Sequence, residues 1–192
     1  MFLTELMQLL ARNGSYPKYQ HERRIDIFIN FFLADILKRK FGAVINTVIP
    51  EFPLKKEDSH ASTNLDYLAY SEVSRTAYLV ELKTDSSSFN EEQCRRYEAA
   101  LERPWTDLLE EIECIKAHTE KRHRDKYEAL LVKLREMSPE RKALVYIGPV
   151  AIQDELPKSA ALISLEELQT MTDLPKHNDE WNIIRQYIVK SS

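Results

Sequence analysis

The sequence predicts an α/β fold in which a central mixed sheet is flanked by helices. Five short runs of β-branched and aromatic residues are typical of strands, and helical patterns precede, separate and follow them. A long helical segment, residues 89–137, separates the third strand run from the fourth, as the crossover between parallel strands requires. The 192 residues are 43% hydrophobic, which suits a single domain over residues 1–192.

A long helix is expected before the sheet. Between Tyr19 and Lys40, apolar residues recur at helical spacing: Ile25, Phe28, Ile29, Phe32, Leu33, Ile36 and Leu37. Gly42 is expected to end this helix, because glycine readily adopts the left-handed conformation found after helix C-termini. The segment MFLTELMQLLAR at the start of the chain is typical of an amphipathic helix and not of a signal peptide.

Three strands are expected next, over residues 43–52, 65–70 and 76–83. Pro50 and Pro53 are expected to close the first strand, and the polar residues 53–64 to form a loop. Because only the five residues SEVSR separate the second and third runs, these two strands are predicted to pair as a hairpin.

Helical patterning then returns. Ser88 and Glu91 match the S-x-x-E capping box, so a helix is expected to begin near Phe89 and to break and restart at Pro104. The remaining expected elements are strands at residues 142–148 and 160–165 and a closing helix at 179–190.

Composition excludes several classes of site. The three glycines do not allow a glycine-rich phosphate loop, which excludes Rossmann and P-loop enzymes. The two cysteines, Cys94 and Cys114, have no neighbours at metal-ligand spacing, and two thiols suit a reducing cytoplasm. No run approaches the roughly 18 apolar residues of a membrane span. The net charge of −4 argues against nonspecific nucleic-acid binding, but a local basic cleft stays open.

Three charged residues are expected to meet at one edge of the sheet. Side chains alternate along a strand, so Glu81 and Lys83 point to the same side. In the predicted hairpin, Asp66 near the start of one strand lies beside them at the end of the other. Two carboxylates suit a hard cation such as Mg²⁺ or Mn²⁺, with the backbone carbonyl of Leu82 as a third ligand and Lys83 holding a water. Such a site has the parts for phosphodiester hydrolysis.

Asp66 followed by Glu81-Leu82-Lys83 resembles the D…(D/E)-x-K signature of the PD-(D/E)XK nuclease superfamily, and the order of elements is similar to its restriction-endonuclease-like α-β-β-β-α-β core. The resemblance covers Glu22 to Ile147, a core of about residues 19–148, with residues 160–190 as a C-terminal strand and helix. It implies a hydrolase, a magnesium-dependent deoxyribonuclease that binds DNA and cleaves it by attack of metal-activated water.

The resemblance also assigns supporting residues. Glu22 matches the carboxylate that many members carry on the helix before the sheet, as a ligand of a second metal or of its water shell, with Asp26 in reserve. QCRRY at 93–97 matches the Q-x-x-x-Y motif of the RecB-like branch, in which Gln93 and Tyr97 support the site and contact nucleic acid. Arg96 is expected to meet phosphates, as are Arg95 and Arg103.

Two other functions stay open. The first is a catalytically inactive member of this fold that binds protein or nucleic acid, and the second is a helical partner-binding protein that docks through residues 89–137. The basic run at 116–135 is interpreted as a solvated helix face with Glu120–Arg124 and Lys121–Asp125 pairs, and Trp105 as a buried anchor. Base-specific recognition would have to come from loops, a second copy in a homodimer or a partner subunit.

Overall fold

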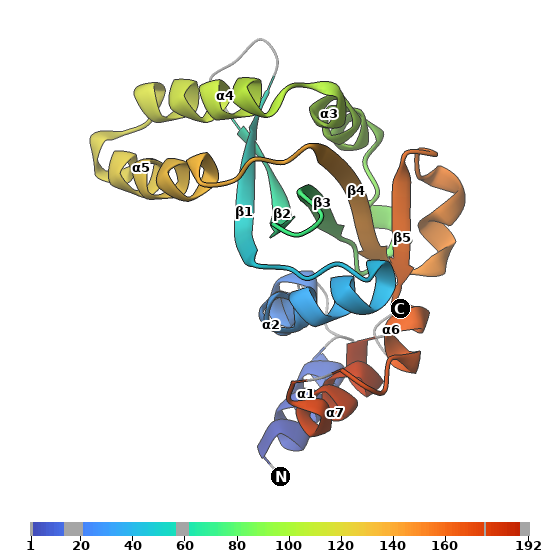
Figure 1. Ribbon diagram of the computed structural model, residues 1–192. Helices are drawn as coiled ribbons and strands as arrows, with labels where there is room; N and C mark the ends of the chain where they lie inside the picture. Colours follow the sequence, from blue (N-terminus) through green and yellow to red (C-terminus); the bar gives the residue numbers. More distant parts are fainter. Residues whose placement is uncertain (1, 14–20, 57–61, 175, 189–192) are drawn as a thin grey trace.

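A five-stranded mixed sheet lies at the centre of the protein in a computed structural model that describes residues 2–13, 21–56, 62–174 and 176–188 (Figure 1). The strands are β1 (Thr47–Lys55), β2 (Ser62–Ser71), β3 (Thr76–Leu82), β4 (Arg141–Gly148) and β5 (Ala160–Ser164). They lie in this order across the sheet, antiparallel from β1 to β3 and parallel from β3 to β5. The predicted α/β class with a mixed sheet flanked by helices is confirmed.

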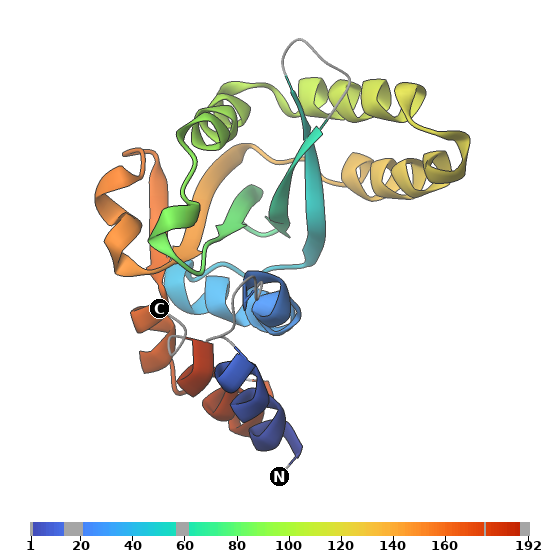
Figure 2. The same cartoon turned by 180° about the vertical axis from the view of Figure 1, so that it is seen from behind.

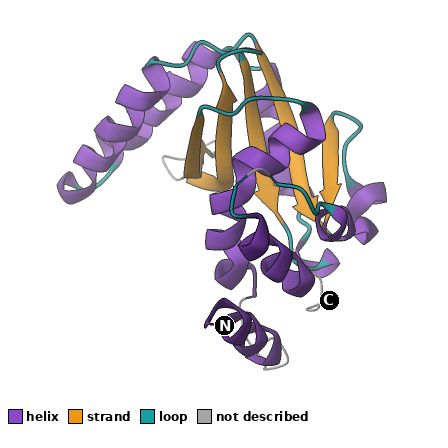
Figure 3. Ribbon diagram, turned by 60° about the horizontal axis from the view of Figure 1, so that its bottom comes forward, coloured by secondary structure: helices purple, strands orange, loops and turns teal. Residues whose placement is uncertain are grey.

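Helices cover both faces of this sheet (Figures 2 and 3). The apolar cluster on one face includes residues of α1 (Phe2–Asn13), α2 (His21–Phe41), α6 (Leu165–Thr170) and α7 (Asn178–Ile188). The cluster on the other face includes residues of α3 (Glu91–Glu102), α4 (Trp105–His118) and α5 (Lys121–Arg135). Two short 3₁₀ turns connect other elements: η1 (Ser86–Ser88) lies between β3 and α3, and η2 (Val150–Glu155) lies between β4 and β5. Within the described ranges, no helix is long and apolar enough to cross a bilayer.

The strand β3 is buried along its whole length, and its two faces serve different purposes. Val80 and Leu82 pack in the cluster with α2, whereas Leu79 packs in the cluster with α3. Since side chains alternate, Glu81 and Lys83 belong to the α3 side. The fold therefore directs both charged residues toward the helix that carries Gln93 and Tyr97.

Two predictions of local structure are confirmed. The strands β2 and β3 pair as an antiparallel hairpin from Tyr67↔Val80 to Ser71↔Thr76. Gly42 ends α2 with a positive φ of 69°, and its N–H donates to the Lys38 carbonyl at 2.8 Å.

The predicted loop at residues 53–64 is wrong at both ends, since β1 continues to Lys55 and β2 begins at Ser62. Pro53 does not end the strand because β1 is at the edge of the sheet, where a missing N–H donor costs no ladder bond. The buried side chains of Phe52 and Leu54 keep this segment on the core.

The long helical segment also differs from expectation. Asn90, not Ser88, caps α3, with its side-chain oxygen accepting from the Gln93 N–H at 3.0 Å. The break at Pro104 is confirmed, but a second break at Thr119 and Glu120 separates α4 from α5. These two helices form the arm that extends from the body in Figure 1.

Contacts within this arm correct two sequence-based pairings. Glu120 forms an ion pair with Arg122 at 2.7 Å, and Arg124 donates to the carbonyls of Ala117 and Thr119 instead of pairing with Glu120. The predicted Lys121–Asp125 pair is not among the ion pairs of the described residues. Trp105 is half-buried and donates to the Leu134 carbonyl at 3.3 Å, which confirms it as an anchor between α4 and α5.

Candidate functional site

The candidate site forms where β2 and β3 separate. Their ladder ends at the pair Tyr67↔Val80, so Asp66 and Glu81 are the next residues beyond it. The Asp66 carboxylate accepts a hydrogen bond of 2.6 Å from the backbone N–H of Leu82. A side-chain oxygen thus links the two strands at the point where their backbone pairing stops.

The other neighbour of β2 is irregular at the same level. The β1–β2 ladder contains Pro50↔Tyr67 and Phe52↔Leu65 but no Glu51↔Asp66 pair, and Glu51 has a φ of 53°. This is the left-handed region, which a residue other than glycine seldom adopts. At Asp66 the β2–β3 ladder therefore ends and the β1–β2 ladder misses one pair before it resumes at Phe52↔Leu65.

The carboxylate of Glu81 lies inside a buried polar network. Its Oε1 accepts from Lys83 Nζ at 2.8 Å, and its Oε2 accepts from the Tyr97 hydroxyl at 2.9 Å. Only 3% of the Glu81 side chain and 9% of the Lys83 side chain are exposed. Burial raises the pKa of Glu81, and the charge and hydrogen bond of Lys83 oppose that rise.

The helix α3 supplies the other side of this network. Gln93 and Tyr97 are one turn apart, so they lie on the same face of the helix. Gln93 Oε1 is 3.5 Å from Lys83 Nζ, and the Tyr97 hydroxyl is also 3.2 Å from the carbonyl oxygen of Asn64. Burial and the charge of Glu81 raise the pKa of Tyr97, so its hydroxyl stays protonated and remains a hydrogen-bond donor.

The arginines of α3 occupy different places. Arg96 forms an ion pair with Glu92 and donates to the Thr63 hydroxyl at 3.0 Å, which places it against β2 three residues before Asp66. Arg95 is exposed and forms an ion pair with Glu91. Arg103 follows the C-terminal end of α3, whereas Gln93 lies in the first turn of this helix. Arg103 pairs with Glu111, so the expectation that it lies near the site is wrong.

Two acidic residues of α2, Glu22 and Asp26, were considered as metal ligands from the sequence. The backbone of Glu22 belongs to the first turn of this helix, but its side chain lies outside the described residues. Asp26 accepts a hydrogen bond from the Tyr67 hydroxyl, whose oxygen is also 3.1 Å from the Asp26 carbonyl oxygen. Tyr67 packs in the α2 cluster, so Asp26 fixes β2 from the face opposite Glu81. Asp26, the alternative to Glu22, therefore makes a structural contact on that opposite face.

The described residues contain no group of three His, Cys, Asp or Glu side chains arranged to hold a metal ion. Asp66 and Glu81 are two carboxylates on adjacent strands: Asp66 accepts from the Leu82 N–H, and Glu81 accepts from the Lys83 ammonium. Carboxylate and carbonyl oxygens are the donors that Mg²⁺ and Mn²⁺ prefer. The chemistry of this donor set fits such an ion.

Two residues of the site were missed by the sequence reasoning. Asn64 contributes only its backbone carbonyl to Tyr97, so no residue type could have signalled it. Gly148 ends β4 beside Lys83, and a Cβ added there would lie 3.2 Å from both the Cβ and the carbonyl oxygen of Lys83. A lone glycine at the end of an apolar strand run is the signal that could have identified this close approach.

Comparisons of the chain with models of known protein families, with curated proteins and with solved structures found no match.

Proposed function

We propose that this protein is a metal-dependent nuclease of the PD-(D/E)XK type, with a restriction-endonuclease-like fold, that hydrolyses phosphodiester bonds of DNA. The observation that supports it is the junction of β2 and β3, where Asp66 binds the Leu82 N–H and Glu81 binds Lys83. Two acids and an amine that the sequence separates by up to 17 positions are thereby held where the pairing of the interior strands β2 and β3 ends.

The ion would be held by oxygen atoms of this junction. Mg²⁺ is commonly bound by one or two carboxylates together with waters and substrate phosphates, so Asp66, Glu81 and the Leu82 carbonyl are a sufficient protein contribution. Glu22 is proposed as the ligand of a second ion or of its water shell. When bound, the metal would lower the pKa of a water and offset negative charge on the phosphoryl oxygen.

The chain's own residues prepare the site for this chemistry. Lys83 is held between Glu81 and Gln93, so its ammonium is fixed where it can orient a water and stabilise charge that develops on the phosphate. Tyr97 holds the second oxygen of Glu81 and so fixes the orientation of that carboxylate. Gln93 and Tyr97 of α3 are therefore positioning groups, whereas Lys83 acts on the reacting atoms.

Incubation of the purified protein with linear, nicked and single-stranded DNA in Mg²⁺ or Mn²⁺ tests this function. Asp66→Ala and Lys83→Ala are expected to lower the cleavage rate by about 100-fold or more. Glu110→Ala, which removes an exposed acid of α4, is the matched control and should cleave as wild type does. Equal cleavage by all four proteins would identify a contaminant and contradict the proposal.

A second candidate function is a binding module of the same fold without catalytic activity. It is favoured by the state of Glu81, since both of its carboxylate oxygens are hydrogen-bonded to protein groups. Calorimetric titration with Mn²⁺ separates the two candidates. Heat of binding that disappears in Asp66→Ala supports the nuclease, and no heat with wild-type protein supports the module.

DNA is the proposed substrate, and a homodimer or a partner subunit would supply sequence preference. A cytoplasmic location is proposed because neither Cys94 nor Cys114 forms a disulfide with another described residue.

A further inference from the structure

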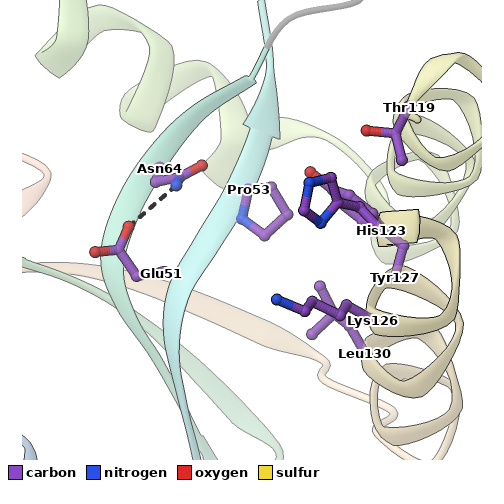
Figure 4. A pocket seen from close by; sticks show the side chains of 8 residues that line it. All are labelled: Glu51, Pro53, Asn64, Thr119, His123, Lys126, Tyr127 and Leu130. Atoms are coloured by element: carbon purple, nitrogen blue, oxygen red, sulfur yellow. Dashed lines mark hydrogen bonds between the residues drawn. The ribbon is translucent and has the colours of Figure 1, made fainter. Parts of the chain in front are cut away.

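A groove beside the candidate site lies between the β1–β2 hairpin and the arm formed by α4 and α5 (Figure 4). Its volume is about 350 Å³, within the range of sites that bind small organic groups. The strands contribute Glu51, Pro53 and Asn64 to its lining, and the helical arm contributes Thr119, His123, Lys126, Tyr127 and Leu130.

The groove and the candidate site share Asn64. Its side chain lines the groove and donates to Glu51 at 3.0 Å, while its backbone carbonyl oxygen lies 3.2 Å from the Tyr97 hydroxyl that also holds Glu81. Asn64 precedes Asp66 by two residues on the same strand. A chain-like ligand could therefore extend from the junction of β2 and β3 into the groove.

The helical wall of the groove carries positive charge. The segment 121–126 contains four Lys or Arg and one Asp, although the whole chain has a net charge of −4, and of its residues His123 and Lys126 line the groove. Lys126 is exposed, and Figure 4 shows its side chain extending into the groove toward the strands. The acids nearby are Glu51 on the strand side, which binds Asn64, Glu120, which pairs with Arg122, and Asp125, which directly precedes Lys126 on α5. The Glu51 carboxylate already accepts from Asn64, whereas the Lys126 ammonium extends into the groove, where it can bind a phosphate.

Flat side chains lie next to that charge. The rings of His123 and Tyr127 come from α5, and in Figure 4 the His123 ring faces Pro53 of β1 across the groove. Rings beside a cation form the combination that binds single-stranded nucleic acid, since bases stack on the rings and a phosphate binds the ammonium.

We propose that this groove binds one nucleotide of a single-stranded segment of the nucleic-acid substrate, adjacent to the bond that is cleaved. Lys126 contacts the phosphate, and His123 with Tyr127 contacts the base. This subsite rests on the proposed nuclease function, because it extends the same substrate beyond the junction of β2 and β3.

The test measures binding of a labelled 20-mer of deoxythymidine to the full chain without divalent ions, so that no cleavage occurs, over a range of salt concentrations. Lys126→Ala should weaken binding and make the slope of log K against log salt shallower by about 0.7, the loss of one phosphate contact on a single strand. Lys121→Ala is the matched control, because it removes the same charge from another face of α5. Its slope should equal that of wild type.

The base contact has its own readout. An oligonucleotide with abasic sites should bind wild type about fivefold more weakly or worse, and His123→Ala should show a smaller difference between the two oligonucleotides. A 20-mer of uridine run in parallel distinguishes DNA from RNA as the strand that is bound.

Several results would overturn the subsite. These are the absence of oligonucleotide binding by wild type, equal slopes for wild type and Lys126→Ala, or equal losses in Lys126→Ala and Lys121→Ala. The last result would indicate diffuse attraction or a protein-docking arm. Binding through Lys126 by a chain that never cleaves DNA would support the subsite and contradict the nuclease, so the two failures are distinguishable.

Discussion

At the scale of single residues, the candidate site depends on a buried carboxylate that is kept in place by its partners. A buried charge is costly unless it is paired and hydrogen-bonded, and Glu81 has both kinds of partner in Lys83 and Tyr97. Removing one partner is expected to cost more than an average hydrogen bond, because the remaining group stays buried without compensation.

Tyr97→Phe tests this dependence. The substitution leaves Glu81 Oε2 and the Asn64 carbonyl without the hydroxyl, and we expect the free energy of unfolding to fall by about 1–3 kcal/mol. Urea denaturation measures it. Tyr127→Phe, at a half-buried tyrosine on α5, is the control and should change stability little. Equal stability of Tyr97→Phe and wild type would mean that the hydroxyl does not support Glu81.

The raised pKa of Glu81 predicts a dependence of stability on pH. Because its folded-state pKa lies above the usual value of 4.5, the folded protein binds more protons than the unfolded chain between these two values. The contribution of Glu81 to stability therefore decreases as pH rises through that window. Urea denaturation of wild type and Glu81→Gln at a series of pH values should show the difference moving in favour of the variant as pH rises above 4.5. A difference that is constant, or that moves the other way, would contradict it.

At the scale of elements, the bend in the β1–β2 hairpin places Asp66. The ladder lacks the pair between Glu51 and Asp66, and Glu51 has a φ of 53° there. Such a conformation costs of order 1–3 kcal/mol and persists only where the surroundings require it. Leu65 and Leu68 pack in the same apolar cluster although they are three residues apart, which shows that the strand changes its facing at this bend.

Substitutions of Glu51 test the bend. Glu51→Gly should be close to wild type in stability, because glycine adopts a positive φ without steric cost and this gain offsets the loss of the exposed hydrogen bond from Asn64. Glu51→Val should be less stable than Glu51→Gly by about 1–2 kcal/mol, since a β-branched residue is poorly tolerated in this region. Chemical denaturation compares the three proteins. Equal stability of the glycine and valine variants would mean that the backbone at residue 51 is not held in this conformation.

The outline of these elements could be predicted from sequence, but their ends and irregularities could not. The hairpin followed from the short SEVSR separation, and the end of α2 followed from Gly42. Pro50 and Pro53 suggested a strand end, but β1 continues through both. The sequence could not show this, because the edge position that tolerates proline is a property of the folded sheet. The positive φ at Glu51 has no pattern in the residues, since glutamate seldom adopts this conformation.

The candidate site could also be predicted only in part from the sequence. The spacing of Asp66, Glu81 and Lys83 could be read as a converging set because strand alternation and a short turn place them. The contact of Asp66 with the Leu82 N–H and the role of the Asn64 carbonyl could not, because backbone groups have no signature in a sequence. Asp26, considered in reserve for Glu22, binds Tyr67 on the face of the sheet opposite Glu81, and helical spacing alone could not show this contact.

At the scale of the whole molecule, the ends of the chain help to build the core that supports the site. Trp181 of α7 is fully buried, donates to the Met171 carbonyl at 2.6 Å and lies 5.0 Å from Phe32 of α2 between ring centroids. The family resemblance ends at Ile147, yet α7 packs in the same cluster as Val80 and Leu82 of β3. The strand that carries Glu81 is therefore held between helices from both halves of the chain.

The central claim is that Asp66 and Glu81 together hold a divalent cation, and a crystal soaked in Mn²⁺ tests it most directly. We predict an anomalous density peak bonded to oxygens of both carboxylates, and the loss of that peak in crystals of Asp66→Ala. A fully occupied Mn²⁺ site elsewhere, with neither carboxylate as a ligand, would contradict the account.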